Sequence, residues 1–278
     1  MRDWSITCED ARDFLARLKA RPAASRPKVL FSDPPYELEQ GGRSKTANHV
    51  MMGGKFSKES YVNDGKICDV DLDWEDWAKP AFEALAPQAE AIIMCNDKHV
   101  GRAQRAFHAA GFRTHNILYW RKNDHGVSVV NRWMRKDTEY ALYLFKGHAR
   151  AVQKGFRHLG QGVSTPDFVP FWPILNSKTG EAKPHPNEKP VKLGLEWMGA
   201  ITRPGETVID PFCGSASFGV AASALGFDFL GCEKNADIAA SARVRLAQTA
   251  ETSTLDLMAR FGGTASFDFA APFYGASA

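Results

Sequence analysis

The sequence predicts an α/β fold in which helices cover both faces of a sheet, and two observations predict it. Short apolar runs alternate along the chain with segments of helical period, as expected for strands interleaved with helices. Several of the runs are too apolar for one side to face water, so helices should pack on both faces. The 278 residues are 44% hydrophobic and 24% charged, which is typical of a globular chain and not of a disordered or fibrous one.

The expected elements follow from this pattern. The strand candidates are Ser5–Cys8, Val29–Ser32, Ala91–Cys95, Asn116–Trp120, Tyr140–Phe145, Thr207–Asp210 and Phe227–Cys232. The helical segments lie at about 10–18, 75–86, 99–110, 190–202, 217–225 and 235–249. The boundaries carry helix signals, because Asn96 and Asp97 precede one helix, Gly111 follows it and Pro190 opens another.

Two stretches, 37–71 and 147–186, do not fit this alternation. Both lack a clear period; the first contains five glycines, and the second is rich in glycine, proline, histidine and basic residues. Loops of this length inside a compact chain are usually functional or disordered. We therefore expect one domain over residues 1–250 with two inserted loops, followed by a C-terminal tail, 251–278, of small and aromatic residues.

Composition argues against several classes of protein. The five cysteines are scattered and never spaced as CxxC, which disfavours a disulfide framework or a zinc site and favours a reducing, cytoplasmic environment. No apolar run reaches about eighteen residues, so no membrane span is expected. The first residues lack the apolar stretch of a signal peptide.

Charge is distributed unevenly along the chain. The net charge is only +3, but residues 98–157 hold thirteen lysines and arginines against three acids. Such a segment is a candidate face for a polyanion. The alternative is a solvated surface that acids from elsewhere in the fold neutralise.

The first chemical signal is Asp33-Pro34-Pro35-Tyr36, directly after an apolar strand. The prolines end the strand, fix φ near about −65° and remove two N–H donors. A carboxylate, a rigid carbonyl and an aromatic ring would suit a planar base with an exocyclic amine: Asp33 and the Pro34 carbonyl accept the amine hydrogens, and Tyr36 stacks on the ring. The alternative is a strand stopped by prolines with a turn-forming aspartate.

The second signal is the end of the strand Thr207–Asp210, where Pro211 and Phe212 are followed by small residues and a helix. Small residues let a ligand approach the backbone, and a helix N-terminus lies behind them. Glu233 ends the next strand, at a spacing suited to hydrogen-bonding ribose hydroxyls. The lack of a P-loop lysine disfavours a triphosphate. A structural turn is the alternative.

Together the two signals resemble the S-adenosylmethionine-dependent DNA N6-adenine and N4-cytosine methyltransferases. Their order, catalytic motif first, resembles the permuted β group. The string His185–Pro190 resembles one that precedes the cofactor strand there, and Ile6–Ala11 resembles the opening motif that contacts the cofactor's adenine. Segments near Trp120–Lys122, Asn131-Arg132 and Glu139–Tyr143 look like phage and prophage members. The resemblance covers most of residues 5–249.

The resemblance implies a Rossmann-like class I methyltransferase fold, a seven-stranded mixed sheet with helices on both faces. It also implies direct transfer of the S-adenosylmethionine methyl group to the N6 amine of a flipped adenine, without a metal. The implied catalytic residues are Asp33, Pro34, Pro35 and Tyr36. The implied cofactor-binding residues are Asp10, Ala11, Asp33, Lys189, Asp210, Phe212, Gly214, Ser215, Ala216, Ser217, Glu233 and Lys234. Cys213 is expected to pack, since no nucleophilic cysteine is needed.

DNA is the expected partner. Flipping a base out of a duplex costs a few kcal/mol, which phosphate contacts from the basic segment could offset. The candidate DNA-binding side chains are Lys45, Lys55, Arg121, Lys122, Arg132, Arg135 and Lys136. The loop 37–71 would serve as a lid over the base. The resemblance also suggests a homodimer, in a bacterial or phage-infected cell, and a link to restriction–modification.

Two positions depart from the family. Ala216 stands where the cofactor loop usually has glycine, and its Cβ would matter if the position needs a positive φ. Glu9 stands where the opening motif usually has glycine.

Three alternatives stay open at this point. Asp33 favours adenine, because the cytosine enzymes of this motif order more often have serine there. N4-cytosine methylation is the first alternative. A catalytically silent binding protein with the same fold is the second. RNA or protein methylation is the third, and it is disfavoured by the DPPY string and the motif order.

Overall fold

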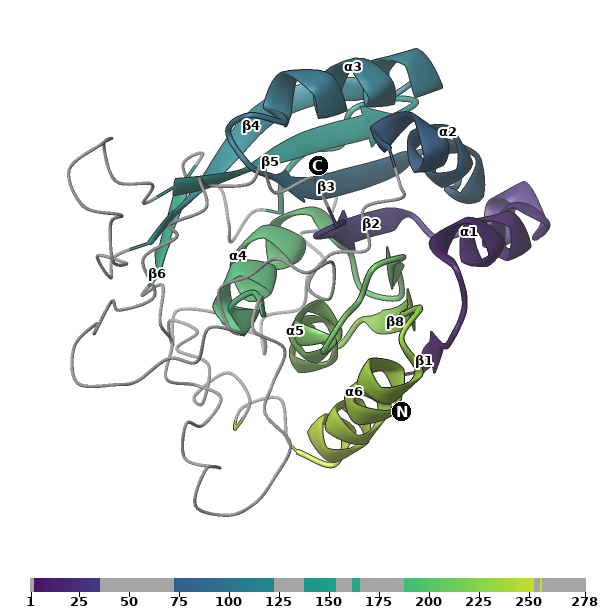
Figure 1. The fold of residues 1–278 in the computed structure, drawn as a ribbon, viewed down its shortest axis with the longest axis vertical. Helices are drawn as coiled ribbons and strands as arrows, with labels where there is room; N and C mark the ends of the chain where they lie inside the picture. The colour runs from purple at the N-terminus through teal and green to yellow at the C-terminus, as the bar shows by residue number, and fades with distance from the viewer. Residues whose placement is uncertain are drawn as a thin grey trace, which may run out of the picture.

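The computed structural model describes residues 3–35, 73–122, 138–153, 162–165, 188–252 and 256 (Figure 1). The strands are β1 Trp4–Thr7, β2 Val29–Ser32, β3 Ala89–Cys95, β4 Arg113–Lys122, β5 Thr138–Lys146, β6 Gly162–Thr165, β7 Thr207–Asp210 and β8 Asp228–Cys232. The helices are α1 Ala11–Lys19, α2 Trp74–Ala84, α3 Val100–Ala110, α4 Val191–Ile201, α5 Ser217–Leu225 and α6 Ala236–Ala250, with a short 3-10 turn η1 at Ala23–Ser25.

Within these residues the strands form one sheet in the order β1-β8-β7-β2-β3-β5-β4-β6. The β1–β8, β8–β7, β7–β2, β2–β3 and β4–β6 pairs are parallel, whereas β5 is antiparallel to both β3 and β4. Every described strand except β5 therefore points the same way. The carboxyl ends of seven strands and the start of β5 meet at one edge, called here the catalytic edge.

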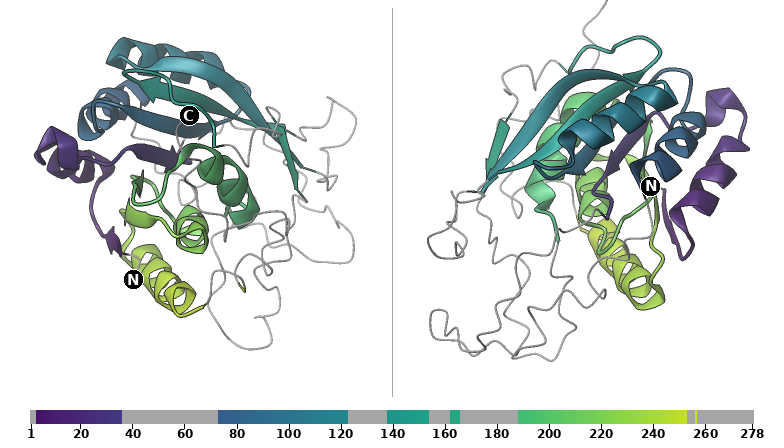
Figure 2. Two further views of the ribbon diagram at one scale, coloured as in Figure 1. Left: turned by 180° about the vertical axis from the view of Figure 1, so that it is seen from behind. Right: turned by 45° about the horizontal axis from the view of Figure 1, so that its top comes forward.

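Helices cover both faces of the sheet, and each face has its own core. One core joins β-strand residues to α1, α2 and α3, with Phe14, Trp77 and Phe107 fully buried. The other joins the sheet to α4, α5 and α6, with Phe31, Met198 and Phe229 buried. The two views of Figure 2 show the three-layer arrangement. Burying apolar side chains on both faces is the main stabilisation of such a fold.

Local signals explain where the helices begin and end. The Asp10 side chain accepts from the Arg12 amide at the start of α1, and Asn235 accepts from two amides at the start of α6. Asp73 and Asp76 form a reciprocal capping box at the start of α2. Gly111 ends α3 with φ 112°, a conformation that favours glycine.

The predicted mixed sheet with helices on both faces is confirmed, and each of the seven predicted strands and six predicted helices is present within a few residues. One detail was wrong, because the described sheet has an eighth strand. β6 lies inside 147–186, which was assigned wholly to a loop, and it pairs with β4 from Tyr119 to Lys122. Four residues, Gly-Val-Ser-Thr, are too short to give a periodic signal of their own. Loop 37–71 lies outside the described residues.

Candidate active site

The catalytic edge brings the two sequence signals together. β2 and β7 are parallel neighbours, with Val29 opposite Val208 and Leu30 opposite Ile209. The turns that follow these strands, at Asp33 and at Pro211, therefore leave the sheet side by side. The prediction that the strand ending before Asp33 lies next to the strand ending at Asp210 is confirmed. Ligands of open α/β sheets bind at this kind of edge.

Asp33 lies in an ion cluster that sequence reasoning did not predict. The Lys189 ammonium is 2.9 Å from Asp33 Oδ2 and 3.0 Å from Glu139 Oε2. All three side chains are mostly buried, with exposed fractions of 19% for Asp33, 18% for Glu139 and 11% for Lys189. Lys189 was assigned to the cofactor by resemblance, whereas here it contacts the proposed catalytic carboxylate. Pro34 is buried, and Tyr36 lies outside the described residues.

A buried hydrogen bond ties the two turns to each other. Ser32 Oγ donates to Asp210 Oδ1 at 2.5 Å, and the Phe212 amide donates to the same oxygen at 3.0 Å. Burial raises the pKa of Asp210 to about 7, an effect that these two hydrogen bonds partly oppose and the charges of Asp33 and Glu233 add to. Asp210 is only 1% exposed, so its carboxylate acts inside the protein, where it aligns the two loops.

The loop that precedes α5 has the open backbone expected of a ligand cradle. Gly214 has φ 50°, and no atom lies within 4 Å of where its Cβ would be. Ala216 has φ 61° and is the non-glycine residue with positive φ among those described. The Cβ of Ala216 was expected to matter if this position has a positive φ, and the position does have one. An L-residue in this conformation costs about 1–2 kcal/mol.

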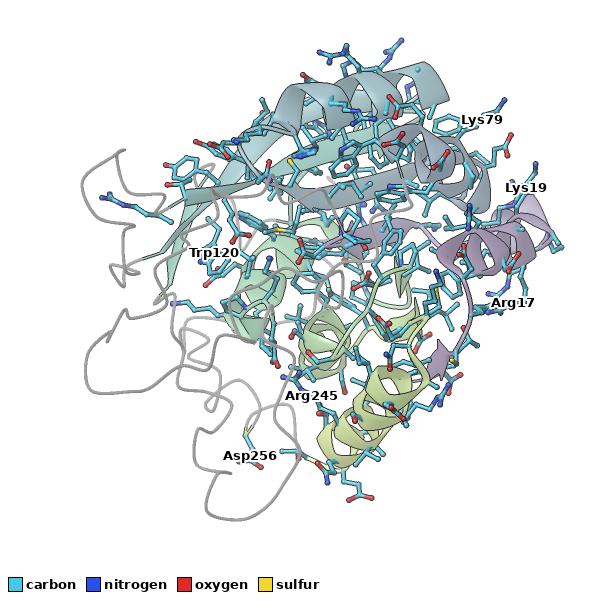
Figure 3. The ribbon with its side chains drawn as sticks, in the orientation of Figure 1. Arg17, Lys19, Lys79, Trp120, Arg245 and Asp256 are labelled. Carbon is cyan, nitrogen blue, oxygen red and sulfur yellow. The ribbon has the colours of Figure 1, made fainter. Side chains whose placement is uncertain are left out.

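Arg245 of α6 holds this loop in place (Figure 3). Its guanidinium donates to the Ser215 carbonyl at 3.0 Å and to Glu188 Oε1 at 2.7 Å. Glu188 immediately precedes Lys189, so one arginine connects the cofactor loop to the segment that carries the ammonium beside Asp33. Arg245 is 11% exposed.

The opening motif lies on the other side of β7. β1 pairs with β8, with Thr7 opposite Cys232, so Asp10 and Glu233 follow adjacent strand ends. Asp10 receives two hydrogen bonds from the Arg12 guanidinium, which lowers its pKa to about 2. Glu233 Oε1 accepts from the Asn235 amide at 2.8 Å. Both carboxylates are thus oriented before any ligand binds.

Glu9, the second departure from the family pattern, has its own local partners. Its carboxylate accepts from the Thr7 hydroxyl and from the Arg17 guanidinium, both at 2.5 Å. The negative charge of Glu9 is therefore paired with Arg17 of α1 and hydrogen-bonded to Thr7 of β1.

Cys213 has the packing role expected for it. The side chain is 6% exposed, and burial raises the pKa of its thiol well above the usual value. Because the thiolate is the nucleophilic form of cysteine, this thiol is unsuited to attack. Among the described residues no cluster of histidine, cysteine, aspartate and glutamate could hold a metal ion. Within the same ranges, no helix is long and apolar enough to span a bilayer.

The chemistry of this edge suits a nucleoside-bearing cofactor. The glycine-containing turn leaves room for a ligand against the backbone, and the N-terminus of α5 lies behind it. The buried Ser217 hydroxyl has no hydrogen-bond partner among the described residues, so a ligand can supply one. Glu233 offers carboxylate oxygens at the tip of the adjacent strand, as ribose hydroxyls require.

Comparison with known families decides the identity. A family described as DNA methylase, the N6/N4 methyltransferases, matches residues 28–243, most of the chain. The protein belongs to the N6/N4 DNA methylase family. The resemblance read from the two motifs is therefore confirmed, and the expected phage-like character stays a prediction.

Individual relatives of this methylase agree with that assignment. It is 27% identical over 253 residues to the type II methyltransferase M2.DpnII of Streptococcus pneumoniae, covering 88% of this chain and 90% of the relative. It is 25% identical to M2.LlaDCHI of Lactococcus lactis subsp. cremoris, covering 78% and 81%.

Solved structures share the fold of this methylase. The crystal structure of the M1.HpyAVI–SAM complex superposes with a TM-score of 0.62 at 19% identity, covering 87% of this chain and 99% of that one. The cytosine-N4-specific PvuII DNA methyltransferase gives 0.61 at 16% identity, covering 94% and 92%. At this identity the likeness shows the fold. The family name covers both N6 and N4 transfer, so membership does not select the target base.

Of the DNA-binding candidates, Arg121 is exposed at the end of β4, on the catalytic edge. Lys122 ends β4, and its side chain lies outside what the structure describes. Lys45, Lys55, Arg132, Arg135 and Lys136 lie outside the described residues. Sequence reasoning missed Ser32, Glu139, Glu188 and Arg245. The one local signal was Ser32, a polar residue in the otherwise apolar strand Val29–Ser32.

Proposed function

We propose that this DNA methyltransferase transfers the methyl group of S-adenosylmethionine to the N6 amine of adenine in DNA. The observation that carries the proposal is the position of Asp33, on the turn after β2, beside the cofactor-type loop that follows β7. An aspartate at this position supports adenine as the target. The carboxylate and the Pro34 carbonyl lie on the same rigid turn.

In the proposed reaction, Asp33 and the Pro34 carbonyl accept the two hydrogens of the exocyclic amine. The lone pair of that amine is delocalised into the ring, so the free base is a poor nucleophile. Hydrogen bonds that favour the pyramidal, charge-developing form act mainly in the transition state, where they raise the rate. Tyr36 is proposed to stack on the extruded base.

The chain's own residues would hold the cofactor, which supplies an electrophilic methyl group when bound. Glu233 is proposed to accept hydrogen bonds from the ribose hydroxyls, and Ser217 and the loop from Phe212 to Ala216 to contact the rest of the molecule. Asp10, Ala11 and Lys234 would border the adenine. Lys189 is proposed to act through the Asp33 carboxylate that it contacts. Asp210 is proposed to act through the hydrogen bonds that it accepts from Ser32 and from the Phe212 amide.

DNA is proposed to bind across the catalytic edge with the target base flipped out of the stack. The basic segment supports this, because Arg121 and the end of β4 lie on that edge. The names of the relatives support a modification enzyme of a restriction–modification system. A homodimer is proposed on the family resemblance alone.

Product analysis tests the proposal. The purified protein is incubated with duplex DNA and S-adenosylmethionine labelled on its methyl group, and the DNA is digested to nucleosides. We expect the label in N6-methyladenine. Label in N4-methylcytosine would overturn the base assignment while leaving the transfer chemistry intact. No transfer to any DNA would overturn the proposed activity.

A further inference from the structure

The Ser32 hydroxyl is buried at the end of β2, directly before the catalytic turn, residues 33–35. Ser32 is 0% exposed and is the polar residue of the otherwise apolar strand Val29–Ser32. At that burial the hydroxyl is out of reach of a substrate, and it donates to Asp210 Oδ1 at 2.5 Å. Burying a hydroxyl group costs free energy that such a hydrogen bond offsets. The Ser32 side chain therefore acts between the two turns of the site.

One carboxylate oxygen joins these two turns. Besides the bond from Ser32 Oγ, Asp210 Oδ1 accepts from the Phe212 amide of the cofactor loop at 3.0 Å. The register of β2 with β7 runs to the pair Leu30–Ile209, so this oxygen continues the connection beyond the paired backbone. A buried hydrogen bond from Ser32 thus helps to set the position of the catalytic turn relative to the cofactor loop.

The cofactor loop has further anchors that do not involve Ser32. The Cys213 amide donates to the Cys232 carbonyl of β8 at 3.0 Å. Arg245 donates to the Ser215 carbonyl at 3.0 Å. These contacts would remain if Ser32 lost its hydroxyl. We therefore expect that loss to shift the catalytic turn and to leave the cofactor loop in place.

Methyl transfer is sensitive to the distance between these two segments. Asp33 and the Pro34 carbonyl are proposed to hold the amine, and the cofactor loop is proposed to hold the methyl donor. As the nitrogen–carbon bond forms, the carbon–sulfur bond breaks with its electron pair on sulfur, and the amine afterwards loses one N–H proton to water. The three atoms must lie in line, and a displacement of about 1 Å can lower the rate about 100-fold.

We propose that Ser32 is a positioning residue for methyl transfer: its hydroxyl, through Asp210 Oδ1, holds the catalytic turn at a fixed distance from the cofactor loop. The proposal rests on the proposed function, since it takes Asp33 and the cofactor loop as the two halves of the reaction site. It holds for adenine and for cytosine, because both bases present an exocyclic amine to the same turn.

The test replaces Ser32 by alanine, which removes the hydroxyl and changes the size of the side chain little. Single-turnover methylation is measured with saturating DNA and cofactor, at a temperature where each variant is folded. The Kd for S-adenosylmethionine is measured by equilibrium binding. We expect the rate constant to fall about 10- to 100-fold, with the Kd changed less than about threefold. Ser32→Thr, which keeps the hydroxyl on a residue suited to a strand, should recover part of the rate.

Ser223→Ala is the matched control. Ser223 is a buried serine of α5 whose hydroxyl has no hydrogen-bond partner among the described residues, so its removal should leave the rate unchanged. A Ser32→Ala rate within about twofold of wild type would overturn the proposal. A rate loss matched by an equal loss of cofactor affinity, or a folded Ser32→Thr protein as slow as Ser32→Ala, would also overturn it.

A double mutant tests whether Ser32 acts through Asp210. In an Asp210→Ala protein the hydrogen bond is already absent, so adding Ser32→Ala should lower the rate by less than about twofold. A further loss as large as in the wild-type background would show that Ser32 acts by another route, and the proposal would be wrong. Absence of transfer by the wild-type protein, by contrast, would count against the proposed function itself.

Discussion

Two ion clusters lie at opposite edges of the sheet. At the catalytic edge Lys189 joins Asp33 and Glu139. At the other end Arg150 joins Glu90 and Glu206, with its Nη1 atom 2.6 Å from Glu206 and its backbone amide 3.0 Å from Glu90. In each cluster one basic side chain contacts two carboxylates, and in the far cluster the Lys28 ammonium also lies 3.7 Å from Glu206 Oε1.

The difference lies in how tightly each cation is held. Arg150 also donates to the Ile201 carbonyl, and the carboxylates it contacts are 0% and 8% exposed. A guanidinium with several fixed partners locks one geometry. Lys189 presents a single point charge, and its two carboxylates remain about a fifth exposed. From this difference we expect the far cluster to hold one local geometry of the fold and the near cluster to leave its carboxylates accessible to a ligand.

The largest effect is expected from Arg150→Met, which removes the guanidinium from the buried carboxylates of Glu90 and Glu206 and leaves Glu206 with the more distant ammonium of Lys28, 3.7 Å away. Breaking a buried pair on one side typically costs about 3–5 kcal/mol, so the free energy of unfolding should fall by about that much. The methylation rate of the folded fraction should stay near wild type, because the cluster is at the far end of the sheet. Chemical denaturation and single-turnover assays measure the two quantities.

The same variant has a pH signature. Burial raises the pKa of Glu90, so lowering the pH neutralises that carboxylate and should reduce the penalty of losing Arg150. Arg113→Met, at an exposed arginine of β4, is the control and should change stability little. A large loss of rate in folded Arg150→Met would break the distinction between the two clusters.

A smaller, pH-dependent effect is expected at Asp210, which lies between the two turns. Its pKa is about 7 in the folded chain against 3.8 for an unperturbed group, so the folded chain binds the proton more tightly. This group therefore makes the wild type less stable as the pH rises from about 4 to about 7. Asp210→Asn lacks that dependence and should gain stability relative to wild type across the same window.

Unfolding midpoints at several pH values measure this, with Asp237→Asn, at an exposed aspartate of α6, as the control. A difference between Asp210→Asn and wild type that does not change with pH would contradict the assignment of a raised pKa to this buried carboxylate.

The smallest effect is expected at Ala216. Glycine there relieves the cost of φ 61°, offset by extra chain entropy and the lost methyl group, so Ala216→Gly should stabilise the fold by roughly 0.5 kcal/mol. Ala221→Gly, in the buried interior of α5, should instead destabilise it by about 1 kcal/mol or more. Equal destabilisation by both substitutions, seen in thermal unfolding, would show that the backbone at Ala216 carries no strain.

The contacts that organise the site differ in how far sequence predicts them. The proximity of Asp33 and Asp210 was predictable, because both lie at the carboxyl ends of buried strands and the family resemblance implies that those two strands are neighbours. The pairing of Lys189 with Glu139 was not, since the two are separated by fifty positions and meet only when β5 lies next to β3. Arg245 gives no local signal either, because it is one of several polar residues on α6. Tertiary packing selects these partners.

The central claim is that methyl transfer depends on the carboxylate of Asp33. It is tested most directly by the single-turnover rate of Asp33→Ala at saturating DNA and S-adenosylmethionine, compared with wild type. Loss of one preorganised group of this kind typically lowers the rate about 100- to 1,000-fold, and we expect a loss in that range with cofactor binding retained. An Asp33→Ala protein that methylates DNA at the wild-type rate would contradict the account.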